Sequence, residues 1–215
     1  MSTILVESTN DALPLRMFEG DLDERAFERA LGASVLAWDI ETSGLDWRTE
    51  RIGTVQVQVE TMTYVVRVNG RTPHRLKALM EDPSILKILH HAMFDLRFLA
   101  YHWDVTAAHV ACTKIASKLV DPEVPCKHHS LAPLVRRYLG IELDKSPQTS
   151  DWTDELSPTQ LQYAANDVRH LWPLYEALDE KIRHKGLLDL RERCYAHLRT
   201  RVELEMGDFP DVFAY

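Results

Sequence analysis

The order of apolar and polar residues predicts several short strands in the first half of the chain. Residues 35–38 are apolar and lead directly into Asp39, and residues 54–59 alternate strictly, which predicts a strand with one buried face. Residues 63–68 follow closely enough to pair with this strand as a hairpin. Two short apolar runs within residues 3–18 predict edge strands, and we expect two further strands at 85–90 and 107–112.

Apolar residues three and four positions apart predict helices between these strands. Asp21, with Glu24 three residues later, is typical of a helix N-terminus. Further helices are expected at residues 73–80, 93–102 and 113–120, the second of them with Asp95 in its first turn and with Phe94, Phe98 and Leu99 facing inward. Strands that come first and then alternate with helices favour an α/β fold, with a mixed sheet flanked by helices.

The second half of the chain is predicted to be helical. Ser130 can cap a helix that Gly140 ends, and Ser157 begins a capping box with a proline at the first helical position. We expect this latter helix to run at least to Trp172, where Pro173 must kink or end it. A last helix is predicted at about 187–204, before an apolar tail at 209–215 that could pack on its own domain or on a neighbouring subunit.

Length and composition predict one domain, spanning residues 1–215. Hydrophobic residues make up 45% of the chain and charged residues 27%, which is ordinary for globular proteins. No apolar run reaches the ~18–20 residues that span a bilayer, and no secretion signal is recognisable, so we expect a cytoplasmic protein without a membrane partner. Three widely spaced cysteines are expected to be reduced thiols that pack in the fold: Cys112, Cys126 and Cys194.

Charge limits the size of any nucleic-acid partner. The net charge is −8, and phosphate neutralisation dominates affinity for long duplexes, so a general duplex binder is excluded. A short nucleic acid could still bind, provided that metal ions and a few local cations neutralise its phosphates. Lys114, Lys118, Lys127 and Lys145 could supply such charge, although scattered lysines are usually solvated surface.

Two groups of polar residues are candidates for chemistry. Asp39 and Glu41 are two residues apart on a predicted strand, so they share a face, and a divalent cation would relieve their repulsion. Two solvated acids at a strand end are the ordinary alternative. On the helix after Ser157, Tyr163 and Asp167 are one turn apart, opposite the apolar stripe, and the ordinary alternative there is a solvated helix face.

In combination, these segments resemble the DEDD superfamily of 3′→5′ exonucleases, in the branch with a tyrosine in its third motif. The three motifs are Asp39-Ile-Glu-Thr-Ser-Gly-Leu45, His90-His-Ala-Met-Phe-Asp95-Leu and Tyr163-Ala-Ala-Asn-Asp167-Val-Arg. The resemblance implies a ribonuclease H-like mixed sheet, three antiparallel strands and then parallel strands, flanked by helices. It covers roughly residues 15–180 as the exonuclease core, and leaves residues 181–215 as a C-terminal helix and tail.

Within the superfamily, the chain resembles the ribonuclease D family, and above all its stand-alone nanoRNase C group. Three segments between the second and third motifs carry the likeness to ribonuclease D: residues 127–131, 139–146 and 150–152. We expect no C-terminal RNA-binding domains like those of full-length ribonuclease D. The stand-alone group degrades very short RNAs and forms ring-like homo-oligomers. Met93 is a departure, because a basic residue is expected there.

The resemblance implies that two divalent ions, Mg²⁺ or Mn²⁺, are the cofactors, and that Asp39 bridges them. Glu41 and Asp167 would complete the site that activates water, and Asp95 would serve the second ion largely through water. Phosphodiester hydrolysis needs an attacking hydroxide, charge neutralisation and leaving-group support, and two ions ~3.5–4 Å apart supply all three. Tyr163, with a reference pKa near 10, is a poor free base and is expected to orient the nucleophile.

Five residues are candidates for substrate binding: Thr42, Gly44, Leu45, His90 and Phe94. In the family a residue at the position of Leu45 wedges against the terminal base. The predicted function is a metal-dependent 3′→5′ exoribonuclease that hydrolyses short single-stranded oligoribonucleotides, dinucleotides included, to nucleoside 5′-monophosphates. The alternatives are ribonuclease D-like trimming of structured RNA, a DNA 3′-5′ exonuclease, and a non-catalytic nucleic-acid-binding protein.

Overall fold

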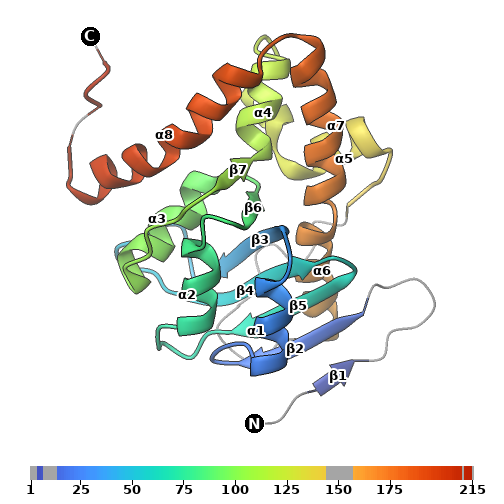
Figure 1. Ribbon diagram of the computed structural model, residues 1–215, viewed down its shortest axis with the longest axis vertical. Helices are drawn as coiled ribbons and strands as arrows, with labels where there is room; N and C mark the ends of the chain where they lie inside the picture. Colours follow the sequence, from blue (N-terminus) through green and yellow to red (C-terminus); the bar gives the residue numbers. More distant parts are fainter. Residues whose placement is uncertain (1–3, 7–13, 144–156, 210, 215) are drawn as a thin grey trace.

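A single sheet organises the described part of the chain, which in this computed structural model comprises residues 4–6, 14–143, 157–209 and 211–214. Within these ranges seven strands lie in the order β1-β2-β5-β4-β3-β6-β7 (Figure 1). Their bounds are β1 Ile4–Val6, β2 Leu15–Glu19, β3 Val35–Thr42, β4 Ile52–Val59, β5 Met62–Arg67, β6 Leu86–Leu89 and β7 Val110–Cys112. The two N-terminal runs form one edge of the sheet, as expected.

Strand directions confirm the mixed sheet that the sequence predicts. β4 is antiparallel to both β3 and β5. β6 is parallel to β3, and β7 is parallel to β6. Three antiparallel strands are therefore followed by two parallel ones, with β2 added parallel to β5 on the far side.

The central strand β4 is buried on both faces, so the prediction of one buried face is wrong. All eight of its residues are buried. Val55 and Val57 join the main apolar core together with Trp38, whereas Thr54 and Gln56 are buried outside that core, on the face that α6 (Pro158–Arg169) covers. The strict alternation of β4 thus reflects two buried faces, one in an apolar environment and one in a polar environment. It does not distinguish buried from solvated positions.

The first helix begins two residues later than the sequence predicts. Helix α1 spans Glu24–Leu31, and its N-cap is Asp23, whose carboxylate accepts from the Ala26 N–H. Asp21 instead accepts from the backbone N–H groups of Arg75 (2.8 Å) and Leu76 (3.3 Å), in the first turn of α2 (His74–Glu81). Asp21 therefore caps a different helix, which no local pattern could indicate.

The middle helices match the predicted ranges closely. They are α3 (Ala92–Trp103), α4 (Thr113–Val120) and α5 (Leu131–Leu139). Between α4 and α5 lies the 3₁₀ turn η1 (Cys126–His129), where the sequence predicts no helix. Ser130 is the N-cap of α5, but its hydroxyl donates to the Lys127 carbonyl and makes no capping hydrogen bond, so this predicted side-chain cap is wrong. Gly140 ends α5 in the left-handed region at φ 71°, as its position predicts.

The helix after Ser157 is shorter than predicted. Helix α6 ends at Arg169, and α7 (Leu171–His184) begins after His170. Pro173 therefore lies in the first turn of α7, where a missing N–H costs little. Trp172, the predicted end of the helix after Ser157, instead lies in the first turn of α7 and is 39% exposed. The last helix, α8 (Leu188–Met206), extends from α7 past β7 and packs on α3 (Figure 1).

Two other expectations can be compared with the described residues. No helix among them combines the length and the apolar character needed to cross a bilayer. The three cysteines are free thiols, with Cys112 buried, Cys194 half-buried and Cys126 exposed. Cys126 is thus not the packing residue that the sequence predicts.

Candidate active site

Strand β3 carries two carboxylates to the face of the sheet that lies beneath α6. Trp38 and Ile40 are buried in the apolar core, and alternate side chains of a strand point to opposite faces, so Asp39 and Glu41 point the other way. They are half-buried. Opposite them on β4 lie Gln56 and Thr54, which follows from the antiparallel register.

Helix α6 places a tyrosine and an aspartate over these carboxylates. The predicted capping box is confirmed, because Ser157 Oγ accepts from the Gln160 N–H (3.2 Å) and Gln160 Oε1 accepts from the Ser157 N–H (2.9 Å). The helix then crosses β3, β4 and β5. Tyr163 is 8% exposed, and its hydroxyl donates to Asp167 one turn later. The alternative of a solvated helix face is therefore wrong for Tyr163.

Helix α3 adds the fourth carboxylate. Asp95 lies in its first turn and is 2% exposed. Leu96 and Leu99 anchor this helix in the apolar core, whereas Phe94, expected inward, is only half-buried. Burial and, to a lesser extent, the negative charge of Asp95 raise the pKa of both Asp39 and Glu41, so Asp95 lies near the two carboxylates of β3.

The carboxylates converge closely enough to share a cation. Ligand oxygens of Asp39, Glu41 and Asp167 all lie within 4.8 Å of one another. Burial, with the neighbouring charges of Asp167 and Asp95, raises the pKa of Glu41 to about 8. Burial also raises the pKa of Asp39 well above its usual range, and that of Asp167 to about 6. Deprotonating the whole group therefore requires compensating positive charge.

The pKa values of the remaining two side chains, Asp95 and Tyr163, are also raised. Burial raises the pKa of Asp95, and its Oδ1 is buried without a hydrogen-bond partner among the described residues. Burial and the charges of Asp167 and Glu41 raise the pKa of Tyr163, which keeps the phenol protonated. Hard carboxylate oxygens with this orphaned atom fit a divalent cation such as Mg²⁺ or Mn²⁺.

Comparison with known proteins identifies the family. Residues 18–183 match the family described as 3′-5′ exonuclease. The chain belongs to this exonuclease family. The exonuclease is 34% identical over 209 residues to DNA polymerase I of Aquifex aeolicus, covering 87% of this chain and 34% of that protein. It is 35% identical over 106 residues to ribonuclease D of Haemophilus influenzae, covering 49% of this chain and 26% of that protein.

Solved structures agree in fold and in family. NrnC of Brucella melitensis with bound Mg²⁺ is 31% identical, with a TM-score of 0.84, and the match covers 94% of this chain and 98% of that chain. The same protein bound to pGG is 32% identical, with a TM-score of 0.85. The exonuclease spans about a third or less of the two curated relatives named above but nearly all of NrnC. These findings confirm the predicted resemblance and the enzyme class.

The segment that follows β3 holds three of the predicted substrate residues. Thr42 donates through Oγ1 to the Gly44 carbonyl (2.6 Å), which tightens the turn. A Cβ at Gly44 would lie 2.8 Å from the Glu50 side chain, so Gly allows a close approach there. Leu45 is 83% exposed and projects from the fold. Its exposure leaves the side chain available to a ligand.

His90 and Phe94 flank the second motif on either side of the α3 N-terminus. His90 Nδ1 lies 2.8 Å from Thr113 Oγ1, while Nε2 is buried without a partner among the described residues. Burial, with the positive charge of Lys114, lowers the pKa of His90 to about 3, so it is neutral at physiological pH. The Phe94 ring lies 5.0 Å from that of Phe98. Lys145 is outside the described residues.

Two features of the site escape sequence reasoning. Gln56 and Thr54 form a buried polar pair opposite Asp39 and Glu41, with Gln56 Nε2 donating to Thr54 Oγ1 (2.6 Å). Their alternation along β4 is the signal that could have found them. Trp47, 6% exposed, packs against α3. Nothing in the local sequence indicates that contact.

Proposed function

We propose that this exonuclease is a metal-dependent 3′→5′ exoribonuclease that hydrolyses short single-stranded oligoribonucleotides to nucleoside 5′-monophosphates. The observation that carries the proposal is the convergence of Asp39, Glu41 and Asp167 within 4.8 Å of one another. Buried acids with raised pKa values have no structural benefit without a cation, because each ionised carboxylate loses its hydration.

The four carboxylates would hold two divalent ions. Asp39 would serve both ions, Glu41 and Asp167 would help to hold the ion that activates water, and Asp95 would serve the other ion. Bound ions would neutralise charge at the scissile phosphate and lower the pKa of water. Tyr163 stays protonated and already donates to Asp167. Its role is to hold that carboxylate and to orient the attacking water through the same hydroxyl.

Two observations support a short substrate. The net charge of −8 leaves little long-range attraction for a long polyanion, so binding depends on contacts at the site itself. The solved NrnC that matches this chain along nearly its whole length is described as bound to pGG. A substrate of a few nucleotides satisfies both observations.

A length series tests the proposal. End-labelled RNAs of two to about 20 nucleotides, with Mg²⁺, are expected to be hydrolysed faster as they become shorter, because the net charge of −8 repels each added phosphate. Asp39→Asn keeps the shape of the side chain and should lower the rate at least about 100-fold. Equal or faster trimming of long structured RNA would favour a processing role like that of ribonuclease D.

A DNA 3′-5′ exonuclease is the second candidate, because the chain is 34% identical to a DNA polymerase I over 209 residues. The same length series made in DNA separates the two. Faster hydrolysis of DNA than of RNA at every length would replace the proposed substrate class.

A further inference from the structure

The loop between β3 and β4, residues 43–51, is anchored on helix α3 by one side chain. Trp47 is buried, and its ring lies 5.1 Å from that of Tyr101 in an edge-on contact. The Trp47 carbonyl accepts from His102 Nε2 (3.0 Å). Leu45, exposed two residues earlier, therefore extends from a loop that is fixed at its centre.

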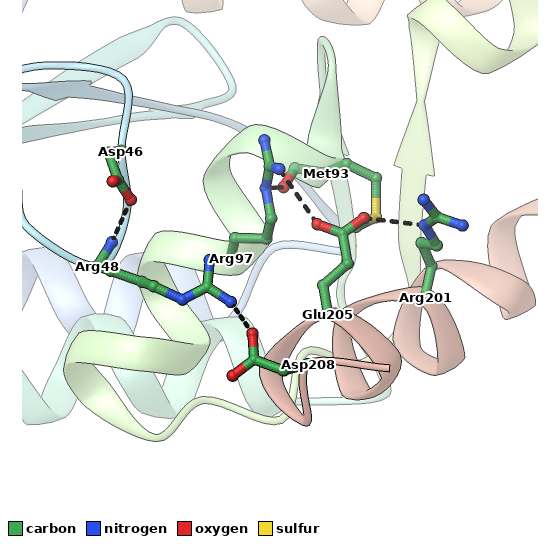
Figure 2. Close-up of polar contacts among 7 residues, drawn as sticks. All are labelled: Asp46, Arg48, Met93, Arg97, Arg201, Glu205 and Asp208. Atoms are coloured by element: carbon green, nitrogen blue, oxygen red, sulfur yellow. Dashed lines mark hydrogen bonds and ion pairs between the residues drawn. The ribbon is translucent and has the colours of Figure 1, made fainter. Parts of the chain in front are cut away.

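The next residue of this loop is held from a distant part of the chain. The Arg48 guanidinium lies over the Trp47 ring, 3.8 Å from its centroid, and forms an ion pair with Asp208, just beyond the end of α8 (Figure 2). Asp46 accepts from the Arg48 N–H (3.0 Å), which sets the turn that directs this arginine. The loop is thus clamped between α3 and the end of α8.

The end of α8 is itself fixed in position. Glu205 pairs with Arg97 of α3 (3.1 Å) and with Arg201 on its own helix (2.8 Å), and both contacts are partly buried. Arg97 also donates to the Met93 carbonyl in the first turn of α3 (2.9 Å), as Figure 2 shows. Contacts run continuously from α3, through Glu205, to Asp208 and the loop.

The backbone at Asp208 supports a specific role for this side chain. The Phe209 N–H bonds to the Leu204 carbonyl (3.0 Å) and the Asp208 N–H to the Glu205 carbonyl (3.3 Å), the two bonds of a Schellman motif. Asp208 occupies the left-handed position of that motif at φ 55°, where glycine is the usual residue. An aspartate there forgoes the conformational ease of glycine and provides the partner of Arg48.

We propose that Asp208 and Arg48 are positioning residues for the nuclease: the end of α8 holds loop 43–51, and with it Leu45, in the orientation that binds substrate. The inference rests on the proposed function, because it takes the exposed Leu45 as a substrate contact. Binding energy provided by the loop is the same in the ground and transition states, so its loss raises KM and leaves kcat unchanged.

Two variants at one position separate this role from a structural one. Asp208→Asn keeps the tolerance for a left-handed backbone and removes the charge; we expect KM to rise about two- to fivefold, the range for an exposed ion pair, with kcat unchanged within twofold. Asp208→Gly suits the backbone better, so KM should rise similarly while the melting temperature stays equal or rises. A purely structural role would leave KM unchanged in Asp208→Gly.

Arg48→Met keeps the stem over Trp47 without the charge, and completes a double-mutant cycle. In the Arg48→Met background, Asp208→Asn should have no further effect on KM. Glu203→Gln is the matched control, because Glu203 lies on α8 and, among the described residues, its side chain pairs only with Arg199 of the same helix. That variant should retain native KM and kcat.

The assay uses the full chain and whichever oligonucleotide the length series shows it to hydrolyse fastest, RNA or DNA. The positioning role can therefore still be tested if the short-RNA proposal fails. Native KM in both Asp208 variants would overturn the positioning role, as would an equal rise in KM with and without Arg48.

Discussion

At the scale of single residues, the carboxylate cluster opposes folding when no metal is bound. Asp39 and Glu41 of β3 converge with Asp167 of α6, Asp95 of α3 acts on the β3 pair by its charge, and burial raises the pKa of each acid. Each ionised form is therefore less stable in the folded protein than in the unfolded chain. A bound cation reverses this effect, so metal affinity and stability are linked.

The pKa of Glu41 predicts how stability depends on pH in the metal-free protein. The folded value of about 8 is above the unfolded value of 4.5, so the penalty is absent below pH 4.5, grows as the pH rises from 4.5 to 8, and is constant above 8. His90, whose pKa is lowered from 6.5 to about 3, makes stability depend on pH only below pH 6.5. Lys87, whose pKa is lowered from 10.5 to about 8, does so only above pH 8. The window of about 6.5–8 therefore excludes His90 and Lys87 and reports on the carboxylate cluster, in which Glu41 titrates together with Asp39 and Asp95.

Between pH 6.5 and 8 the melting temperature of the metal-free protein should fall by about 2–4 °C, the effect of roughly 1 kcal/mol in a chain of this size. Calorimetry in the presence of a chelator measures it. Glu41→Gln should flatten the dependence, and excess Mg²⁺ should also reduce it. A melting temperature that rises across this window would contradict the assignment of Glu41.

Tyr163 should affect turnover and not metal binding. Its phenol stays protonated and donates to Asp167, so Tyr163→Phe removes the hydroxyl and keeps the ring. We expect kcat to fall about 10- to 100-fold, within the range for loss of a proton-handling group. The rise in melting temperature on adding Mg²⁺ should be retained, because all four carboxylates remain. Loss of that rise would indicate a role in holding the metal.

At the scale of elements, the cap of α6 fixes the helix that carries Tyr163 and Asp167. Ser157→Ala removes the Oγ that accepts from the Gln160 N–H, one of the two bonds of the capping box, and should cost about 1 kcal/mol, or about 2–4 °C in melting temperature. Ser130→Ala is the control, since Ser130 occupies the N-cap of α5 without a capping bond. An equal loss of melting temperature in the two variants would show that the capping bond of Ser157 does not stabilise α6.

Sequence reasoning identified those elements whose cause is local. The capping box at Ser157 and the left-handed stop at Gly140 depend on neighbouring residues and were predicted correctly. Asp21 caps α2 from 54 residues away along the chain, and the burial of β4 on both faces depends on where α6 packs. Such contacts follow from the tertiary fold, which periodicity does not describe.

The candidate site was likewise predictable only where its geometry depends on residues that are close together in the sequence. Spacing placed Asp39 with Glu41 on one face, and Tyr163 with Asp167 on one turn, while the meeting of these segments with Asp95 was inferred from resemblance. Gln56 and Trp47 were missed because their contacts come from strand register and from packing on α3. Local patterns thus predict the pair on β3 and the pair on α6, whereas the tertiary fold determines how the two pairs come together.

At the scale of the whole molecule, the charge of −8 predicts weak dependence on salt. A substrate with one or two phosphates releases few counterions, so a plot of log KM against log salt should have a slope below about 1.5 for a dinucleotide. Steady-state kinetics between 50 and 300 mM KCl at fixed Mg²⁺ measures it. A slope above about 3 would instead indicate an extended binding track along the surface.

The position of β4 has a consequence for inactivation by heat. Every residue of this strand is covered, and β3, which bears Asp39 and Glu41, is hydrogen-bonded along it. Amides in such a strand exchange with deuterium only when the entire molecule opens. Asp39 and Glu41 thus belong to the last region to come apart, and we expect catalysis to be lost in the same cooperative step as the fold.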